Sequence, residues 1–192
     1  MIIIALGANL PGPYGPPKRS LQMAIGLMAA AGVDVKRVSS LYATPPYPPS
    51  SQPYFVNAAI SVAWAGEPLD LLELLHAVEA ALGRRRRRRW AARTIDLDLI
   101  DFEGQLIGAG PQIVHDRIQR PFCLPHPQCH KRDFVLGPIA EIAAKWRHPV
   151  YGQTARALWP KPFPRRIGRL SAATKLPEPL MQRFLDIHAS SG

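Results

Sequence analysis

The chain has few of the features that would place it outside the cell or in a membrane. Only two of its 192 residues are cysteines, Cys123 and Cys129, so we expect reduced thiols and no disulfide framework. No apolar run approaches the roughly 20 residues that a membrane helix needs. The opening "MIIIALGANL" has no basic region before its apolar residues, which favours a strand over a signal peptide. These absences together favour a cytoplasmic protein.

Acidic residues are also scarce. Only 14 Asp and Glu stand against 24 Lys and Arg, which gives a formal net charge of +10. Such an excess favours anionic partners, whether nucleic acid, a membrane surface or phosphorylated small molecules, and does not choose among them. The sequence has no Gly-x-x-x-x-Gly-Lys-Ser/Thr loop, so any nucleotide must be held by a different device.

The hydrophobic pattern that is present predicts one α+β domain. Short apolar runs favour strands at residues 1–7, 33–44, 54–64 and 94–102. Apolar residues at helical spacing, bounded by prolines and glycines, predict helices at residues 17–32 and 67–83. The order strand, helix, strand, strand, helix, strand is that of a ferredoxin-like βαββαβ core, with helices on one face of an antiparallel sheet.

The rest of the chain carries weaker signals. Glu103-Gly104 suggests a hairpin return, and residues 108–121 should form a longer loop. A short helix over residues 133–143 should be interrupted near Gly137-Pro138. The chain then divides into a domain, residues 1–159, and a basic, proline-containing C-terminal extension, residues 160–192. The extension has no assigned role and contains one candidate short helix.

The stretch "RTIDLDLIDF" places two acids, Asp96 and Asp98, two residues apart in a predicted strand. Residues i and i+2 of a strand point to the same face, so the carboxylates repel each other and lose hydration unless a cation lies between them. Hard oxygen ligands suit Mg²⁺, which takes its other ligands from water and substrate phosphates. Alternatively, both acids face solvent on an edge strand or pair with Arg93 and its neighbours.

Six consecutive arginines, residues 84–89, precede this acidic pair. Packed together they would repel one another, so they belong in a solvated loop that gains from meeting a polyanion. A basic loop without a specific role is the common alternative, and nucleic-acid contact is another. Carboxylates that hold Mg²⁺ beside guanidinium groups are, however, an arrangement that stabilises phosphoryl transfer.

Two further loop regions hold candidate ligands. "FCLPHPQCHKRDF" contains two Cys and two His, but four zinc ligands within eight residues would be crowded, so His126 and Arg132 are better interpreted as anion donors. Aromatic side chains beside the proline-rich loop and the arginine run could hold a flat heterocycle, and Asn57 could recognise its hydrogen-bonding edge. Taken singly, each of these aromatics is more typical of the core or of a loop anchor: Tyr47, Phe55, Trp90 and Phe134.

These pieces, in this order, resemble the 6-hydroxymethyl-7,8-dihydropterin pyrophosphokinases of folate biosynthesis. The matching segments cover residues 2 to about 158 and include "ALGANL", "SSLYATPPY", "QPYFVNAAI" and "LPHPQCHKRDFVLGPIAEIA". The combination of R-x-I-D-L-D-L with P-H-P-x₄-R-x-F is the most specific part. The resemblance implies a ferredoxin-like core that binds ATP and two Mg²⁺ ions. Such enzymes transfer the β and γ phosphates together to the pterin hydroxymethyl oxygen and release AMP.

The resemblance also implies roles for individual residues. Asp96 and Asp98 would hold both metal ions, and Arg84, Arg86 and Arg93 would be catalytic. The residues that bind ATP would be Glu79, Arg84, Trp90, Arg93, His126 and Arg132. The pterin would lie between Phe55 and Phe134, in a pocket made by Thr44, Pro45, Tyr47, Phe55, Asn57, Trp90 and Phe134.

Some features depart from the resemblance. The arginine run is one residue shorter than in such enzymes, which leaves either Arg86 or Arg87 as the residue supplied by a loop that closes during catalysis. Pro127 removes a possible phosphate contact. Residues 108–121 look like an insertion, and residues 160–192 extend beyond the family core.

Two functions from other classes compete with pyrophosphoryl transfer. A nucleic-acid-binding module would use the arginine run on phosphates and aromatics on bases, but would leave the acidic pair unexplained. A two-metal nuclease would use the acids but gives no role to Asn57 or to the Thr44-Pro45-Pro46 loop. We therefore expect a cytoplasmic enzyme, favoured as a monomer, whose partners are ATP and hydroxymethyldihydropterin and include neither nucleic acid nor a membrane.

Overall fold

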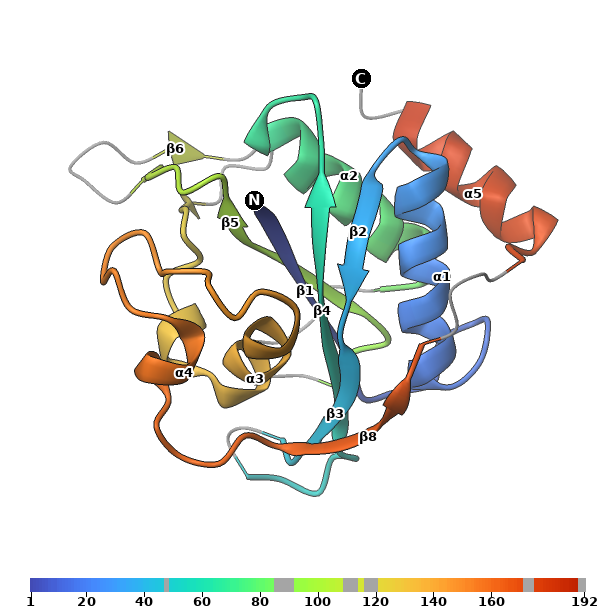
Figure 1. The fold of residues 1–192 in the computed structure, drawn as a ribbon. Coiled ribbons are helices and arrows are strands. Elements are labelled where there is room, and N and C mark those ends of the chain that lie inside the picture. Colours follow the sequence, from blue (N-terminus) through green and yellow to red (C-terminus); the bar gives the residue numbers. More distant parts are fainter. Residues whose placement is uncertain (47–48, 85–91, 109–113, 116–120, 171–174, 190–192) are drawn as a thin grey trace.

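The fold is built on a six-stranded antiparallel sheet (Figure 1), and the computed structural model describes residues 1–46, 49–84, 92–108, 114–115, 121–170 and 175–189. The strands of the sheet are β1 (Ile2–Ala8), β2 (Asp34–Val38), β3 (Ser40–Thr44), β4 (Phe55–Ala63), β5 (Asp96–Phe102) and β8 (Arg165–Arg169). A separate pair consists of β6 (Val114–His115) and β7 (Pro121–Phe122). The helices are α1 (Pro17–Ala30), α2 (Pro68–Ala81), α3 (Asp133–Ile142), α4 (Ala155–Leu158) and α5 (Glu178–Ala189), and a 3₁₀ turn, η1, spans Cys129–Lys131.

The strand order confirms the predicted ferredoxin-like core. The sheet runs β5-β1-β4-β3-β8, and β2 also pairs with β4. The single strand predicted at residues 33–44 is divided into β2 and β3. At the division the Ser39 N–H donates to the Ala59 carbonyl, and the Ser39 hydroxyl accepts a hydrogen bond from the Ala59 N–H, each at 3.0 Å. The serine side chain thus replaces a backbone acceptor where the strand bends.

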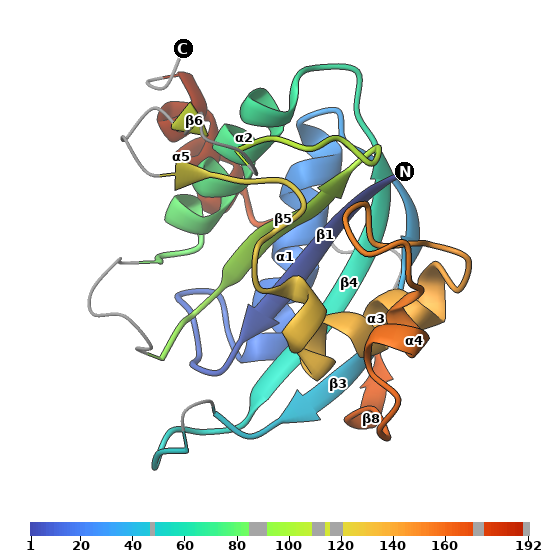
Figure 2. The ribbon, with the colours of Figure 1, turned by 90° about the vertical axis from the view of Figure 1, so that its left-hand side faces the viewer.

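Helices cover both faces of the sheet, and not only one as the sequence pattern predicts (Figure 2). The alternating residues Ile2, Ile4 and Leu6 pack beneath α1 and α2, whereas Ile3 and Ala5 pack beneath α3. A strand that is buried on both faces reads as a continuous apolar run, which is what "IIIAL" is. This arrangement leaves the ends of β1 and β5 between two helical layers.

Helix α3 is continuous, whereas the sequence predicts an interruption at Gly137-Pro138. Proline inside a helix removes the hydrogen bond from its own nitrogen to the carbonyl four residues earlier, here Phe134. The loss is offset because Val135, Leu136 and Ile139 are buried against the sheet. Helical stability in a folded protein comes chiefly from such packing.

The hairpin predicted after β5 does not form. Glu103 and Gly104 do make the turn, with φ of 53° and 76°. The chain that follows leaves the sheet, and Ile107 pairs in an isolated bridge with Leu124. In the described sheet β5 therefore has β1 as its strand partner.

The C-terminal extension packs on the core. β8 continues the sheet beside β3, and the predicted short helix is α5, which buries Leu180 and Phe184 against the layer of α1 and α2. None of the described helices is long and apolar enough to span a membrane.

Candidate active site

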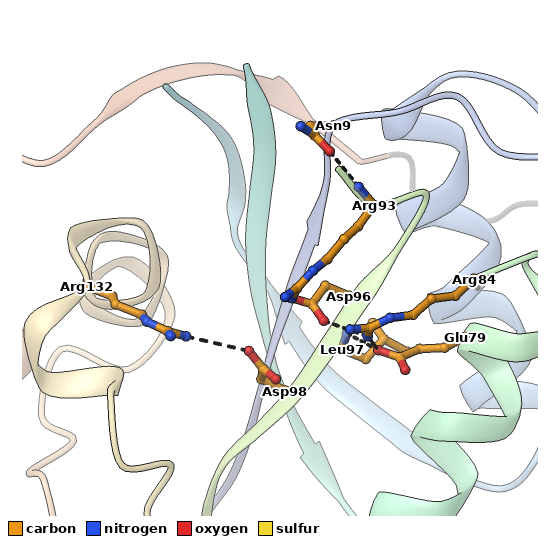
Figure 3. A network of polar contacts seen from close by, with 8 residues as sticks. All are labelled: Asn9, Glu79, Arg84, Arg93, Asp96, Leu97, Asp98 and Arg132. Atoms are coloured by element: carbon orange, nitrogen blue, oxygen red, sulfur yellow. Dashed lines mark hydrogen bonds and ion pairs between the residues drawn. The ribbon is translucent and has the colours of Figure 1, made fainter. Parts of the chain in front are cut away.

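Asp96 and Asp98 lie at the beginning of β5 with both side chains on one face of the sheet (Figure 3). Their partners across the strand pair are Gly7 and Ala5 of β1. Ala5 packs beneath α3, whereas Leu97 packs in the core beneath α1 and α2. Alternation along β5 therefore directs both carboxylates to the α3 side.

Three arginines from separate segments surround the two carboxylates (Figure 3). Arg84 Nη1 is 2.6 Å from one oxygen of Asp96, and Arg93 forms an ion pair with the other. Arg132, which precedes α3, places Nη1 4.0 Å from Asp98 Oδ2. Guanidinium groups bind carboxylate and phosphate oxygens with the same geometry. The same groups can therefore exchange a carboxylate contact for a contact with a phosphate.

Glu79 of α2 joins the helix to β5 beneath this group. The side chain is buried, with 2% of its surface exposed. Its Oε1 accepts a hydrogen bond from the backbone N–H of Leu97 at 2.7 Å, and the carboxylate also pairs with Arg84. Because Leu97 lies between the two aspartates, Glu79 fixes the segment of β5 that carries them. Little of its surface is left for a nucleotide.

The electrostatics of the Asp96 carboxylate combine burial with neighbouring charges of both signs. Burial and the neighbouring Asp98 carboxylate raise the pKa of Asp96, and the two arginines beside it offset part of that rise. Among the described residues no group of three or more His, Cys, Asp or Glu could hold a metal ion. Two carboxylates alone are nevertheless the protein ligands that suit Mg²⁺, since it completes its shell with water and phosphate oxygens.

His126 lies beside the carboxylates. Its backbone N–H donates to the Ile100 carbonyl at 2.9 Å, which ties the loop before η1 to β5. Burial lowers the pKa of the His126 imidazole, while the nearby Asp98 carboxylate acts in the opposite sense. The neutral imidazole can still donate one hydrogen bond to an anion.

Asn9 is a candidate site residue that sequence reasoning missed. Its Oδ1 accepts a hydrogen bond from the backbone N–H of Arg93 at 2.8 Å (Figure 3). Its Nδ2 donates to the Gln52 side chain and the Pro53 carbonyl, at 3.1 and 3.2 Å. A buried Asn directly after an apolar strand was the available signal, because such an amide must find partners. Asn9 thereby joins the loop before β4 to the segment that carries Arg93.

A second group of candidate residues lies on the same face of the sheet. Asn57 Nδ2 donates to Thr44 Oγ1 at 2.9 Å, and both side chains are buried. Asn57 is the register partner of Gly7, which is in turn the partner of Asp96. A Cβ atom at Gly7 would lie 3.0 Å from Asn57 Oδ1. Glycine at this position thus lets the Asn57 amide lie over β1, in the same row as Asp96.

Aromatic rings flank this second group from two elements. Phe55 begins β4 and pairs with Thr44, and Phe134 lies in the first turn of α3. Both rings are half-buried. The guanidinium carbon of Arg132 is 5.7 Å from the centre of the Phe134 ring, within the range of a cation–π contact. Pro45 follows β3 directly and is exposed.

A cavity of about 350 Å³ opens between α2, β5 and the loop before η1. Its apolar lining includes Leu72, Leu99 and Phe122. Its polar lining includes all the described residues predicted to hold ATP or metal ions: Glu79, Arg84, Arg93, Asp96, Asp98, His126 and Arg132. The described residues predicted to bind the pterin lie outside this lining, in or next to β3, β4 and α3: Thr44, Pro45, Phe55, Asn57 and Phe134.

Comparison with known proteins assigns the chain to a family. The family model described as 7,8-dihydro-6-hydroxymethylpterin-pyrophosphokinase (HPPK) matches residues 3–144. The chain belongs to the HPPK family. The match spans β1 through α3 and therefore contains both groups of candidate residues.

Several curated HPPK relatives are similar over most of their length. The chain is 35% identical over 168 residues to 2-amino-4-hydroxy-6-hydroxymethyldihydropteridine pyrophosphokinase of Synechocystis, which covers 82% of this chain and 78% of the relative. It is 39% identical over 140 residues to the Bacillus subtilis enzyme of that name, covering 72% and 75%. With the Methylorubrum extorquens enzyme it shares 36% over 168 residues, covering 87% and 96%.

Solved HPPK structures share the fold. The crystal structure of Plasmodium falciparum HPPK-DHPS wild type with pteroate superposes with a TM-score of 0.65 at 13% identity. The superposition covers 83% of this chain but 43% of that longer one. At such low identity the likeness supports the ferredoxin-like architecture alone.

Three residues predicted for the HPPK site lie outside the described residues. They are Tyr47 of the proline-rich loop and Arg86 and Trp90 of the arginine-rich segment. The choice between Arg86 and Arg87 falls in the same segment. The two cysteines that raised the zinc alternative have different neighbours. The Cys123 thiol donates to the Gly108 carbonyl, whereas the Cys129 thiol contacts His148.

Proposed function

We propose that the cavity around Asp96 and Asp98 binds ATP with two Mg²⁺ ions, and that the group around Asn57 binds the pterin. The observation that supports this proposal is one row of register partners, in which Asn57, Gly7 and Asp96 follow one another across β4, β1 and β5. Adjacent strands lie about 4.8 Å apart, so Asn57 and Asp96 are separated by roughly 10 Å. A bicyclic substrate bound at one end can place its hydroxymethyl group near the other.

The reaction follows from the family. As a member of the HPPK family the chain is an ATP-dependent pyrophosphokinase of folate biosynthesis, which acts on 6-hydroxymethyl-7,8-dihydropterin. The pterin hydroxymethyl oxygen forms a bond to the β-phosphorus of ATP, and the bond from that phosphorus to the bridging oxygen of the α-phosphate breaks. The hydroxyl loses its proton, AMP leaves, and the product is the pterin diphosphate.

The residues of the cavity would act on the phosphates in distinct ways. Asp96 and Asp98 would hold the metal ions, and bound Mg²⁺ would neutralise phosphate charge and lower the pKa of the coordinated hydroxyl. Arg84 and Arg93 would leave the Asp96 carboxylate and contact the phosphates as negative charge accumulates on the leaving group. Arg132 and His126 would bind the triphosphate from the opposite wall.

The pterin residues would recognise the substrate by shape and hydrogen bonding. Asn57 has one amide hydrogen bond to Thr44 and retains an Oδ1 acceptor for the edge of the heterocycle. Phe55 and Phe134 come from the sheet and from α3, so a flat ring can stack between them. Binding between two elements makes the affinity for the pterin sensitive to the distance between them.

We also propose that the enzyme acts as a monomer in the cytoplasm without a nucleic-acid partner. Two features support this. The described carboxylates of the site would repel a nucleic-acid backbone. The two free cysteines are compatible with a reducing compartment.

The test of the proposed function is AMP formation from ATP and Mg²⁺, measured with and without 6-hydroxymethyl-7,8-dihydropterin. We expect AMP to appear only when the pterin is present. AMP formation at the same rate without the pterin would indicate ATP hydrolysis and would contradict the assignment of the pterin as acceptor. Omitting Mg²⁺ should abolish the reaction, and a rate independent of Mg²⁺ would contradict the metal assignment.

A further inference from the structure

The C-terminal extension binds the two elements that would form the walls of the pterin pocket. β8 pairs with β3 from Ser40 opposite Arg169 to Ala43 opposite Arg165 (Figure 1). β3 ends one residue later at Thr44, the hydrogen-bond partner of Asn57. The extension is thus attached directly beside the sheet wall of the pocket.

Arg166 of β8 connects this wall to α3. Its Nε donates a hydrogen bond to Tyr42 Oη at 3.0 Å and lies 3.7 Å from Glu141 Oε2. Tyr42 Oη in turn donates to Glu141 Oε2 at 2.8 Å. Tyr42 belongs to β3 and is buried, and Glu141 lies in the last turn of α3. Three elements therefore meet at one phenolic hydroxyl.

Two further contacts strengthen the same junction. Glu141 also accepts hydrogen bonds from the backbone N–H and the hydroxyl of Ser40, at 3.1 and 2.9 Å. Phe163, just before β8, packs on Gly137 in the middle of α3, where an added Cβ would lie 3.3 Å from the ring. The segment before β8 and the strand itself thus contact α3 at two separate places.

The register extends this junction to the proposed active site. Arg166 is the partner of Tyr42, and Tyr42 is the partner of Asn57. With Gly7 and Asp96 the row crosses β8, β3, β4, β1 and β5. One line of residues therefore runs from the extension, past the proposed pterin group, to the proposed metal site.

We infer that residues 163–169 form a strap that fixes the distance between β3 and α3, with Arg166 as a positioning residue for the pterin. This inference rests on the proposed pterin pocket. The cavity assigned to ATP has no lining residue from β3 or β8. Arg132, at the N-cap of α3, does line that cavity. Loss of the strap contact should therefore weaken pterin binding more than ATP binding.

The test compares Arg166→Ala with Arg165→Ala in the full chain. Arg165 is the preceding residue of β8, its side chain is exposed, and no ion pair joins it to another described residue. We expect Arg166→Ala to raise the KM for the pterin by about threefold to tenfold, the effect of losing one ordinary hydrogen bond, because the Arg166 side chain is largely exposed. The KM for ATP and kcat should stay within twofold. Arg165→Ala should leave all three values within twofold.

A double-mutant cycle with Tyr42→Phe tests the path of the effect. Tyr42→Phe keeps the buried ring but removes the hydroxyl that joins Arg166 to Glu141. If Arg166 acts through that hydroxyl, the double variant should have the same pterin KM as the more affected single variant. If the increases in pterin KM of the two single variants multiply in the double variant, Arg166 does not act through the Tyr42 hydroxyl.

Two results for Arg166→Ala would overturn the strap. One is an unchanged pterin KM, and the other is an equal rise in the KM values for pterin and ATP, which would indicate general loss of structure. Asn57→Ala distinguishes failure of the strap from failure of the proposed function. A raised pterin KM in Asn57→Ala with no effect of Arg166→Ala overturns the strap alone. An unchanged pterin KM in Asn57→Ala overturns the pocket and the strap together.

Discussion

Glu79 Oε1 lies 2.7 Å from the backbone nitrogen of Leu97, so a buried helix carboxylate holds the one residue that separates Asp96 from Asp98. The same carboxylate pairs with Arg84, which also contacts Asp96. The geometry of the proposed metal site therefore depends on a side chain that need not touch the metal or the nucleotide.

We predict that Glu79→Ala lowers the free energy of unfolding by about 3 kcal/mol, because it removes the acceptor of a buried N–H and one of the two partners of the half-buried Arg84 guanidinium. Glu79→Gln should lose less, since the amide oxygen can still accept from Leu97. Urea unfolding of the three proteins measures the difference. Equal losses in both variants would show that the hydrogen bond to Leu97 contributes nothing.

Asp96→Asn should abolish turnover while the protein stays folded. The substitution keeps the size of the side chain but removes one of the two charges that would hold Mg²⁺, so we expect kcat to fall at least about 100-fold. Activity measured against Mg²⁺ concentration checks this. The control is Asp101→Asn. Asp101 lies on the same strand but outside the cavity, and its carboxylate accepts a hydrogen bond from the Trp146 indole at 2.8 Å. Retained turnover in Asp96→Asn would contradict the metal assignment.

Local sequence signals account for the core of the fold and for part of the site. Period-two alternation placed Asp96 and Asp98 on one face of β5, and the prolines and glycines that bound the apolar repeats predicted α1 and α2. These signals depend on neighbours within one element. The interruption predicted in α3 was wrong because a proline rule is local, whereas the burial of Leu136 and Ile139 depends on the sheet.

Contacts between distant segments were not predictable in this way. Asn9 and Arg93 are 84 residues apart, and Tyr42 and Arg166 are 124 apart. Neither pair has a spacing that a helix or strand would reveal. The position of β8 beside β3 depends on the register of the sheet, which the composition of a basic, proline-containing tail does not encode. Only the fold reveals that the tail adjoins the proposed pterin pocket.

The pH dependence of stability should carry a contribution from His126. Burial lowers the pKa of the folded-state imidazole from its ordinary value of 6.5, so the unfolded chain binds a proton more readily. The contribution of this group to stability is complete above pH 6.5 and is lost as the pH falls through the folded-state pKa. His148 is also buried and acts with the same sign.

We therefore predict that lowering the pH from 7.5 to 5.5 reduces the Tm of His126→Gln by less than it reduces the Tm of the parent protein. Thermal unfolding without nucleotide, recorded for both proteins across this range, measures the effect. His148 titrates in both proteins and cancels in the difference. A steeper loss of Tm in His126→Gln would mean that the histidine is stabilised in its charged form by Asp98.

Gly7→Ala should disturb the residues proposed to bind the pterin, through steric contact with the Asn57 side chain. The added Cβ would lie 3.0 Å from Asn57 Oδ1, closer than most real Cβ contacts, so the amide must move. We expect a loss of about 1–3 kcal/mol in the free energy of unfolding and a rise in the pterin KM. The backbone at Gly7 lies in β1, where alanine has no conformational penalty of its own.

The Asn57→Ala background isolates that contact. There the clashing amide is absent, so Gly7→Ala should cost less than half as much free energy as in the parent protein. Urea unfolding of the four proteins completes the cycle, and the pterin KM of the single variants links it to activity. An equal cost in both backgrounds would mean that the methyl group disturbs β5 or α3 instead, and that Gly7 is needed to keep the face of the sheet open beside Asp96.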